Sequence, residues 1–256
     1  MTLHLPLTGP AVITGGARGL GFSLASALAS GGSAVALLDI LPEVTESAER
    51  LAQQHGVDAV GLRVDVTDQA AVAGAFAEAA ERLGTPRVLL TAAGITVWND
   101  SVEVSDAEWR RVMAVNLDGT FFAAQAFGRG LLEAELGGSA VFVASMSGSI
   151  VNVPQFQASY NASKAAVAHL ARSLAVEWAP AGIRVNSISP GYFLSDMTRQ
   201  FTEQNPDLAR DWTARIPAGR MGEPGDLHGL VGFLASDASA YLTGQDLVID
   251  GGYTAV

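Results

Sequence analysis

Short apolar runs recur along the chain and alternate with longer, Ala-rich stretches. Each run is apolar almost throughout instead of at every second position, which is typical of parallel strands buried on both faces. We expect strands at 11–14, 33–39, 59–65, 87–92, 139–145, 184–189 and 246–250. We expect helices near 20–31, 43–55, 68–83, 106–134, 158–180 and 224–236. This alternation predicts an α/β protein with a doubly wound, seven-stranded parallel sheet and helices on both faces.

No linker or change of composition divides the chain, so residues 1–256 are predicted to form one domain. One segment, 192–221, breaks the alternation, because it is long, mixed in composition and punctuated by Pro206 and Pro217. Long segments of this kind often carry function. We therefore expect this one to act as a lid over a substrate.

Composition narrows the possible functions. Of the 256 residues, 49% are hydrophobic and 16% are charged, which allows a large core. The formal net charge of -11 argues against nucleic acid and anionic membranes as partners, because both call for basic surfaces. Cys is absent, which excludes disulfides and thiolate catalysis and fits a cytoplasmic protein.

The sequence indicates neither a metal site nor an export signal. The histidines are scattered without metal-ligand spacing, so no metal is predicted. The N-terminus lacks a basic region followed by a long apolar run, so no signal peptide is expected. No apolar run reaches the length of a membrane span. The histidines are His4, His55, His169 and His228.

The glycine-rich segment GGARGLG joins the first expected strand to the first expected helix. Gly15, Gly19 and Gly21 permit a tight turn, close backbone approach and close helix packing, and the amides at the helix start suit a pyrophosphate. Glycine-rich turns are common, but this position between strand and helix favours a dinucleotide site.

Three charged residues bear on which dinucleotide binds. Asp39 ends the second strand, where a carboxylate accepts hydrogen bonds from the adenosine ribose and repels a 2′-phosphate, so we favour NAD over NADP. Arg18 is the opposing signal, since a basic residue in this loop could contact a 2′-phosphate. Asp65 follows the third strand and either bonds the adenine amino group or caps the helix that begins near Asp68.

In the segment ASYNASKAAV, Tyr160 and Lys164 lie one helical turn apart and share a helix face. Alone, this spacing fits proton transfer or ordinary packing beside a solvated charge. A free phenol has a pKa of about 10, too high for a base near neutral pH. A nearby ammonium favours the phenolate and would lower that pKa.

Further motifs follow in a fixed order over essentially the whole chain. AAG spans 92–94, VNLDG spans 115–119, Ser145 ends the fifth strand and PG spans 190–191. Together with TGGARGLG and YNASK, this order resembles the single-domain form of the short-chain dehydrogenase/reductase family. The resemblance implies a Rossmann fold and an oxidoreductase that transfers a hydride between a nicotinamide cofactor and an alcohol or ketone.

The resemblance also implies roles for single residues. Tyr160 would be the general acid/base, with a pKa lowered by Lys164 and by the positive nicotinamide ring. Lys164 would also hold the nicotinamide ribose, and Ser145 would donate a hydrogen bond to the reacting oxygen. Asn116 would hold a relay water, partly through its main chain. The expected NAD-binding residues are Gly15, Arg18, Gly19, Leu20, Gly21, Asp39, Asp65, Val66, Ala92, Gly94, Tyr160, Lys164, Pro190 and Gly191.

The chain departs from the family pattern in two places. The family usually has an Asn ahead of the Ala-Gly of its strand-four motif, whereas this chain has Thr91, Ala92, Ala93 and Gly94. Any stabilising role of that Asn is therefore lost or moved. The interval from Ser145 to Tyr160 is also longer than the commonest family spacing, and we expect it to line the substrate pocket.

Ser147, Asn152 and Gln155 lie in this long interval, and each can both donate and accept hydrogen bonds. They either bind substrate hydroxyls or satisfy the loop backbone. Longer strings, such as SMSGSIVNVPQFQASYNASKAAV and DGGYTAV, resemble the family's sugar-alcohol dehydrogenases, such as the galactitol and arabinitol enzymes. The implied substrate contacts are Ser145, Ser147, Asn152, Gln155 and Tyr160. Apolar pocket walls, or alternatively core residues, are expected at Trp98, Phe156, Tyr192 and Phe193.

The helices at 106–134 and 158–180 look apolar on more than one face, which indicates burial between subunits. With the resemblance, this implies a homotetramer or a homodimer. Some polyol-active relatives hold magnesium at the C-terminal end, but no carboxylate cluster here requires it. Two other functions remain: an NADPH-dependent 3-oxoacyl-[acyl-carrier-protein] reductase, disfavoured by net charge and Asp39, and a non-catalytic nucleotide-binding protein, which would be expected to have lost Ser145, Tyr160 or Lys164.

Overall fold

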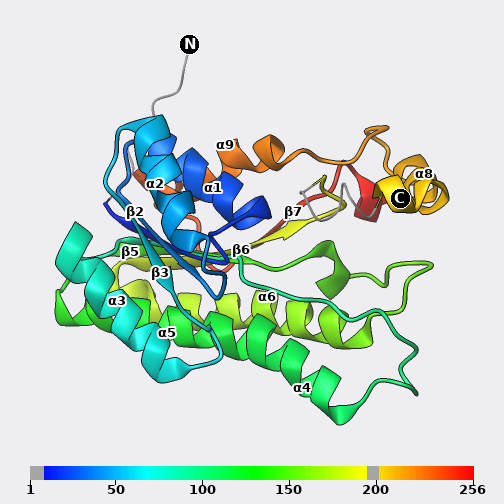
Figure 1. Cartoon of the computed structure of the whole chain (residues 1–256), viewed down its shortest axis with the longest axis horizontal. Helices are drawn as coiled ribbons and strands as arrows, with labels where there is room; N and C mark the ends of the chain where they lie inside the picture. The colour runs from blue at the N-terminus through cyan, green and yellow to red at the C-terminus, as the bar shows by residue number, and fades with distance from the viewer. Residues whose placement is uncertain (1–8, 195–201) are drawn as a thin grey trace.

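Seven parallel strands form one sheet in the computed structural model, which describes residues 9–194 and 202–256 (Figure 1). The strand order is β3-β2-β1-β4-β5-β6-β7. All seven predicted strands are confirmed, with ends shifted by at most two residues. Residues 195–201 of the predicted lid lie outside the described residues. The strands are β1 Ala11–Thr14, β2 Val35–Asp39, β3 Ala59–Arg63, β4 Val88–Thr91, β5 Gly138–Val143, β6 Ile183–Pro190 and β7 Asp246–Ile249.

Helices cover both faces of the sheet, with α1, α2 and α9 on one face and α3 to α6 on the other (Figure 1). Neighbouring residues of a strand join opposite layers, as Val12 and Ile13 do in β1. Each strand is therefore buried on both faces, which explains why its sequence is apolar throughout. The helices are α1 Gly19–Ser30, α2 Val44–His55, α3 Gln69–Leu83, α4 Asp106–Met113, α5 Gly119–Glu133, α6 Ala158–Trp178, α8 Pro206–Ala214 and α9 His228–Ala235.

The single helix predicted over 106–134 is divided in the structure. A π-helical turn, Ala114–Asp118, separates α4 from α5 and carries Asn116. Close packing accompanies the turn, because a Cβ on Gly119 would lie 2.8 Å from Cγ2 of Val66. Single π turns inside α-helices are frequent at functional sites.

The start of α3 tests one of the two readings of Asp65, that it caps this helix. Asp68 is the N-cap, and its Oδ1 accepts hydrogen bonds from the backbone N–H groups of Ala70 and Ala71 at 3.0 Å each. Asp65 instead accepts from Thr67, through the backbone N–H at 2.9 Å and the hydroxyl at 2.8 Å. The suggestion that Asp65 caps this helix is therefore wrong.

The strand order places the predicted site residues at one edge of the sheet. From β1 the chain builds outwards to β2 and β3, and then returns to the other side of β1 with β4. Crossovers that leave in opposite directions open a crevice at the carboxyl ends of the strands. Thr14, Asp39 and Thr91 end three of these strands at the crevice.

Thr91 carries a buried hydroxyl that lacks a hydrogen-bond partner among the described residues. It is 2% exposed and pairs in register with Thr14 of β1. The Thr14 hydroxyl, in contrast, accepts a long hydrogen bond of 3.4 Å from the Ala93 backbone N–H. Leaving a buried hydroxyl unpaired costs about 1–3 kcal/mol.

Replacement of Thr91 by Val is therefore expected to raise the free energy of unfolding by about 1 kcal/mol, because the shape is kept and the unpaired hydroxyl is removed. Urea denaturation measures the change. Thr14→Val is the matched control on the neighbouring strand, and it is expected to lower stability because it removes an acceptor. Equal destabilisation by both variants would contradict this explanation.

Candidate active site

The glycine loop after β1 is shaped by residues that lack a side chain. Gly15 and Gly19 have φ angles of 68° and 60°, which L side chains rarely adopt. A Cβ on Gly21 would collide with the carbonyl oxygen of Gly15, whereas a Cβ on Gly19 would meet nothing within 4 Å. No side chain caps α1 at Arg18. The amides of the first turn of α1 therefore keep their capacity to bind an anion.

Asp39 ties the end of β2 to the glycine loop. Its Oδ2 accepts a hydrogen bond from the backbone N–H of Ala17 at 3.0 Å, and its Oδ1 accepts one from Leu41 at 3.1 Å. The side chain is 9% exposed. A carboxylate has about four acceptor positions, so two remain for a ligand beside the loop.

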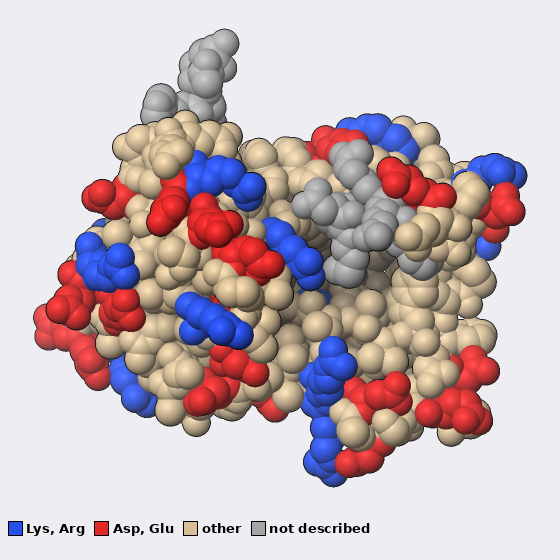
Figure 2. Space-filling view, viewed as in Figure 1, with Lys and Arg blue, Asp and Glu red and all other residues tan. Residues whose placement is uncertain are grey.

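A cavity of about 620 Å³ lies between the loop, α2 and the turn that precedes α9. Arg18 and Arg50 line it, and the guanidinium of Arg50 lies 4.2 Å from the centre of the Phe22 ring. Glu43 and Glu46 line it too, so acidic groups offset the basic ones. Figure 2 shows basic side chains bordering a hollow on the viewed face, amid interspersed charges of both signs.

The other predicted cofactor residues lie near the same edge, with different exposure. Leu20 is partly buried and packs against the layer of α1 and α2. Val66 is 7% exposed, while Asp65 is exposed. Pro190 ends β6, and the Gly191 backbone N–H donates to Ile249 at 2.8 Å, in line with the sheet.

Gly94 brings the segment after β4 against the catalytic candidates. A Cβ on Gly94 would lie 3.4 Å from both Oδ1 of Asn116 and Nζ of Lys164. Ala92 is partly buried, and its backbone N–H donates to Thr14 at 3.1 Å. A side chain at Gly94 would therefore lie directly against both polar groups.

Asn116 joins three parts of the site. Its Oδ1 accepts from the backbone N–H of Ile95 at 2.8 Å, and its Nδ2 donates to the Ile95 carbonyl and to Oγ of Ser163, each at 2.9 Å. Its main-chain carbonyl accepts from the hydroxyl of Thr120 at 2.8 Å. Both protons of the side-chain amide are engaged within the chain, so a relay water would use the second acceptor position of Oδ1 or the main-chain carbonyl.

Lys164 is the only lysine in the sequence, and it is 5% exposed. Its Nζ donates to the carbonyl of Val143 at the end of β5, at 2.7 Å. Burial lowers the pKa of Lys164 from 10.5 to about 8. The side chain is therefore still mostly an ammonium at pH 7, held against the sheet edge.

Tyr160 lies beside this ammonium, with Nζ of Lys164 5.7 Å from the ring centre. Burial raises the pKa of Tyr160, and a hydrogen bond with Ser145 opposes the rise. The expected lowering of this pKa by Lys164 is therefore not found in the protein alone. Tyr160 is partly exposed.

The predicted substrate residues form a polar network rather than three separate contacts. Asn152 is 2% exposed, and its Nδ2 donates to the hydroxyl of Tyr192 at 3.1 Å. Gln155 Nε2 donates to the same hydroxyl at 2.9 Å. Ser147 donates its backbone N–H to Oγ of Ser145 at 3.2 Å, so it directly adjoins this predicted catalytic residue.

Several residues of this network were not predicted from the sequence. Gln157 bonds Ser147 and Asn152, and Trp212 Nε1 donates to Oε1 of Gln155 at 3.3 Å. The sequence signal for Gln157 was its place just before the YNASK helix, but nothing in the sequence indicated where its side chain points. The residues missed in this network are Gln157, Asn161, Trp212 and Tyr253, whose ring centre lies 5.4 Å from that of Tyr192. Ser163, which bonds Asn116, was also missed.

The residues predicted as apolar pocket walls differ in placement. Trp98 is 42% and Phe156 60% exposed. Tyr192 stacks on Trp212, with centroids 4.4 Å apart and planes at 12°. Burial raises the pKa of Tyr192, and the hydrogen bonds from the two amides oppose this. Phe193 is 6% exposed and belongs to the core, so for this residue the core alternative holds.

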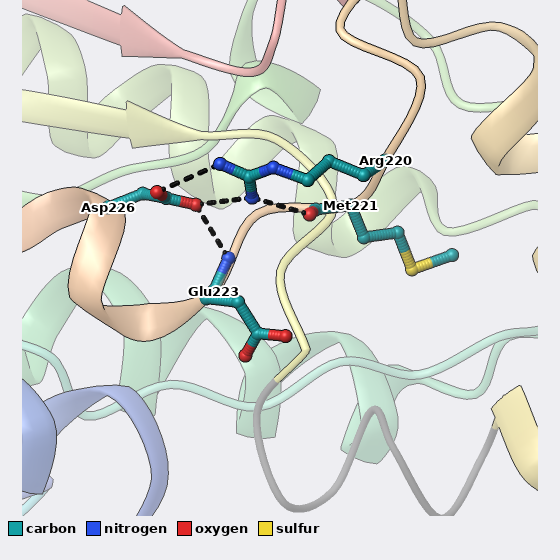
Figure 3. Close-up of polar contacts among 4 residues, drawn as sticks. All are labelled: Arg220, Met221, Glu223 and Asp226. Carbon is teal, nitrogen blue, oxygen red and sulfur yellow. Dashed lines mark hydrogen bonds and ion pairs between the residues drawn. The ribbon is translucent and has the colours of Figure 1, made fainter.

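The two ends of the 192–221 segment are fastened together. Phe193 pairs with Gly222, and the backbone N–H of Gly222 donates to the Tyr192 carbonyl at 2.9 Å. Arg220 then bonds both oxygens of Asp226, at 2.7 and 3.0 Å (Figure 3). The Arg220 hydrogen bonds lower the pKa of Asp226 to about 2. These contacts between the two ends of the segment fix the backbone of Tyr192 next to the candidate site.

The residues present fit a dinucleotide. The open position at Gly19 would hold its phosphates, the free acceptors of Asp39 its ribose, and the segment of Gly94 beside Lys164 its nicotinamide. A hydroxyl, a phenol and an ammonium converge at the nicotinamide end, and such a set can transfer a proton and stabilise a developing oxyanion. In the described part of the chain, no three His, Asp or Glu side chains cluster as a metal site would need, and no helix there could cross a membrane.

Comparison with known proteins finds a family model and relatives that match this chain over most of its length. Residues 15–254 match the family model described as Enoyl-(Acyl carrier protein) reductase. A galactitol 2-dehydrogenase (L-tagatose-forming) of Cereibacter sphaeroides is 45% identical over 95% of this chain and 94% of its own. A D-arabinitol 2-dehydrogenase [ribulose-forming] of Candida tropicalis is 40% identical over 94% of this chain and 91% of its own.

Solved structures agree with this placement. A short-chain type dehydrogenase/reductase from Mycobacterium marinum is 39% identical, with a TM-score of 0.93, over 99% of this chain and 98% of its own. A protein from Beutenbergia cavernae that holds NADP at low occupancy is 36% identical, with a TM-score of 0.90, over 99% of each chain. At these identities the likeness extends beyond the fold.

Replacement of Lys164 by Met is expected to stabilise the fold at pH 7 while abolishing turnover. The folded pKa of about 8 lies below the ordinary 10.5. Between these values the unfolded chain binds more protons, so wild-type stability rises with pH across this window. We expect a gain of about 1–2 kcal/mol at pH 7, after the lost bond to Val143 is counted, and a smaller gain at pH 10.

Urea denaturation of both proteins from pH 7 to pH 10 measures this difference. Arg172→Met is the matched control, because it removes an exposed cation from the same helix. Its effect on stability should not vary across this pH range. A Lys164→Met variant that is less stable than the wild type at pH 7 would contradict the buried-charge account.

Proposed function

The chain belongs to the short-chain dehydrogenase/reductase family, and on this premise we propose that it transfers a hydride between NAD and a secondary alcohol of a sugar alcohol, or the carbonyl of the corresponding ketose. The observation that carries the proposal is the convergence of Ser145, Tyr160 and Lys164 beside the glycine loop. NAD, when bound, supplies the hydride acceptor, and the protein supplies position and proton transfer.

Tyr160 is the proposed general base in the oxidation direction. Its Oη takes the proton of the substrate hydroxyl as the carbonyl forms. Ser145 Oγ accepts the backbone N–H of Ser147, so its own proton remains available for the substrate oxygen. The Lys164 ammonium favours the phenolate form of Tyr160 through charge.

Asn116 is proposed to connect Lys164 to solvent. Its side chain holds the segment after β4 against α6, through Ile95 and Ser163. Its main-chain carbonyl, in the π turn, is the group offered to a water that passes protons to or from Lys164.

NAD is the proposed cofactor. The Asp39 carboxylate is fixed beside the loop and keeps acceptors for ribose hydroxyls, while its charge would repel a 2′-phosphate. Arg18 is exposed, and the cavity that it shares with Arg50 also contains Glu43 and Glu46. These carboxylates weaken the attraction that an additional phosphate would find there.

A sugar alcohol is the proposed substrate class. The galactitol and arabinitol dehydrogenases above are similar over nearly the whole chain. The network of Ser147, Asn152, Gln155 and Tyr192 provides several polar groups next to Ser145, as a polyhydroxylated ligand requires.

We also propose one catalytic domain over 1–256 with 192–221 as its lid, and assembly into a cytoplasmic homotetramer or homodimer. Large apolar side chains are exposed on α4, α5 and α6, and burial between subunits would remove them from water. They are Trp109, Phe121, Leu132 and Val176.

A panel of hexitols and pentitols with NAD and with NADP tests the proposal. We expect NADH formation from at least one polyol, and Tyr160→Phe should lower kcat by at least about 100-fold while NAD affinity stays within twofold. Activity only with NADPH and acyl thioesters would overturn the proposal. A Tyr160→Phe variant that keeps most of its activity would overturn the acid/base assignment.

Cofactor choice is tested separately at Asp39. Asp39→Ala should raise kcat/KM for NADP relative to NAD by about 10-fold or more, because the repelling carboxylate is removed. Asp58→Ala, in an acidic residue at the opposite end of the neighbouring strand β3, controls for net charge. An unchanged ratio in Asp39→Ala would show that Asp39 does not read the ribose.

A further inference from the structure

Gln157 occupies a position that usually caps a helix. It is the N-cap residue of α6, the helix that carries Tyr160 and Lys164, but its side chain makes no capping hydrogen bond. Ser, Thr, Asp and Asn are preferred at this position because their side chains satisfy an amide of the first turn. The Gln157 side chain is 6% exposed and turns into the substrate loop instead. The helix thus forgoes a stabilising cap.

The Gln157 amide sets the direction of the hydrogen bonds around it. Its Nε2 lies 3.0 Å from Oδ1 of Asn152, 3.1 Å from Oδ1 of Asn161 and 3.3 Å from Oγ of Ser147. An amide nitrogen can only donate. The two protons of this nitrogen are shared among three acceptors, of which Ser147 Oγ is the farthest. Ser147 Oγ accepts from Gln157, so its own proton remains for another acceptor. The neighbouring Ser145 Oγ likewise accepts from the Ser147 backbone.

A second fixed donor sets the far end of the same network. Trp212 Nε1 can only donate, and its bond to Oε1 of Gln155 orients that amide. Gln155 Nε2 and Asn152 Nδ2 then both donate to the hydroxyl of Tyr192. With two donors on its oxygen, the Tyr192 hydroxyl has one proton left, and a hydrogen bond with Tyr253 engages it.

We propose that Gln157 is a positioning residue for substrate hydroxyls, an inference that rests on the function proposed above. Through direct contact it leaves the Ser147 hydroxyl as a hydrogen-bond donor, and through Asn152 it holds the Tyr192 oxygen in place. The Ser147 donor selects substrates with an oxygen acceptor on a carbon next to the reacting one. A polyol or an α-hydroxy ketone meets this requirement, and a simple ketone does not.

Fixed donors discriminate more strongly than mobile ones. A hydroxyl that is free to rotate loses orientational freedom on binding, whereas one already oriented by an amide has little such freedom to lose. A substrate without the matching oxygen leaves such a donor desolvated and unpaired, which raises its KM. The selectivity then depends on Gln157, although Gln157 need not touch the substrate.

Two variants test the inference against two substrates: the polyol or ketose on which the wild type is most active, and a ketone without neighbouring hydroxyls. Gln157→Leu keeps the approximate volume and removes the donor. We expect kcat/KM for the ketose to fall about 10–100-fold, mainly through KM, and that for the simple ketone to fall less than about threefold. NADH affinity, measured by fluorescence titration, should stay within twofold.

Gln157→Glu supplies a readout that a structural role would not give. The carboxylate places an acceptor against the Asn152 and Asn161 oxygens, and protonation restores one donor. The ratio of its ketose KM to that of the wild type should therefore fall severalfold from pH 8 to pH 6. Gln69→Leu is the control. This exposed amide begins α3 and bonds Gln125 of α5, away from Gln157.

The outcomes separate this inference from the proposed function. A wild type that turns over simple alcohols and ketones but no polyol overturns both. A wild type active on polyols, with Gln157→Leu losing equally on both substrates, overturns the positioning role alone. A pH-independent defect in Gln157→Glu does the same. Selective loss on the ketose, with unchanged kinetics in Gln69→Leu, supports the inference.

Discussion

The buried ammonium of Lys164 is the constraint on which the active site depends. A lone cation in the protein interior is unfavourable, and its lowered pKa reflects that cost. The Lys164 ammonium donates a hydrogen bond to the Val143 carbonyl at the carboxyl end of β5. This carbonyl is available because the strand ends there. Gly94 and Asn116 then approach the ammonium closely. The lysine therefore brings together segments that follow β4, the π turn, β5 and α6.

Burial shifts the pKa values of Lys164 and Tyr160 in opposite directions. It favours the neutral amine at Lys164 and the neutral phenol at Tyr160, so the protein alone is not prepared for base catalysis. The Lys164 ammonium beside Tyr160 does not by itself reverse this preference. Under the proposed function, the oxidised cofactor would add a second positive charge, and proton abstraction would then become favourable.

The sequence predicted the fold well, because strands buried on both faces must be apolar throughout, as Val12 and Ile13 show. Motif order likewise predicted the residues around Lys164, which the structure brings together. The π turn was not predictable, since it accompanies packing between Gly119 and Val66, far apart in the sequence.

The substrate side was predicted less well. Asn152 and Gln155 were expected to face substrate, but each also serves to orient the Tyr192 hydroxyl. Gln157 and Trp212 were missed because the direction of a side chain and its long-range partners follow from tertiary packing rather than from residue type. Which groups of a hydrogen-bond network donate and which accept can be assigned only when the groups that can only donate have been located.

The pKa of Tyr160 in the protein with and without NAD tests most directly whether cofactor charge offsets the effect of burial. Ultraviolet difference titration measures phenolate formation, and subtraction of Tyr160→Phe isolates this residue from the other three of the four tyrosines. We predict a pKa above its usual value in the free protein, and a decrease of at least about one unit with saturating NAD. The same pKa with and without NAD would contradict the claim that cofactor charge offsets burial.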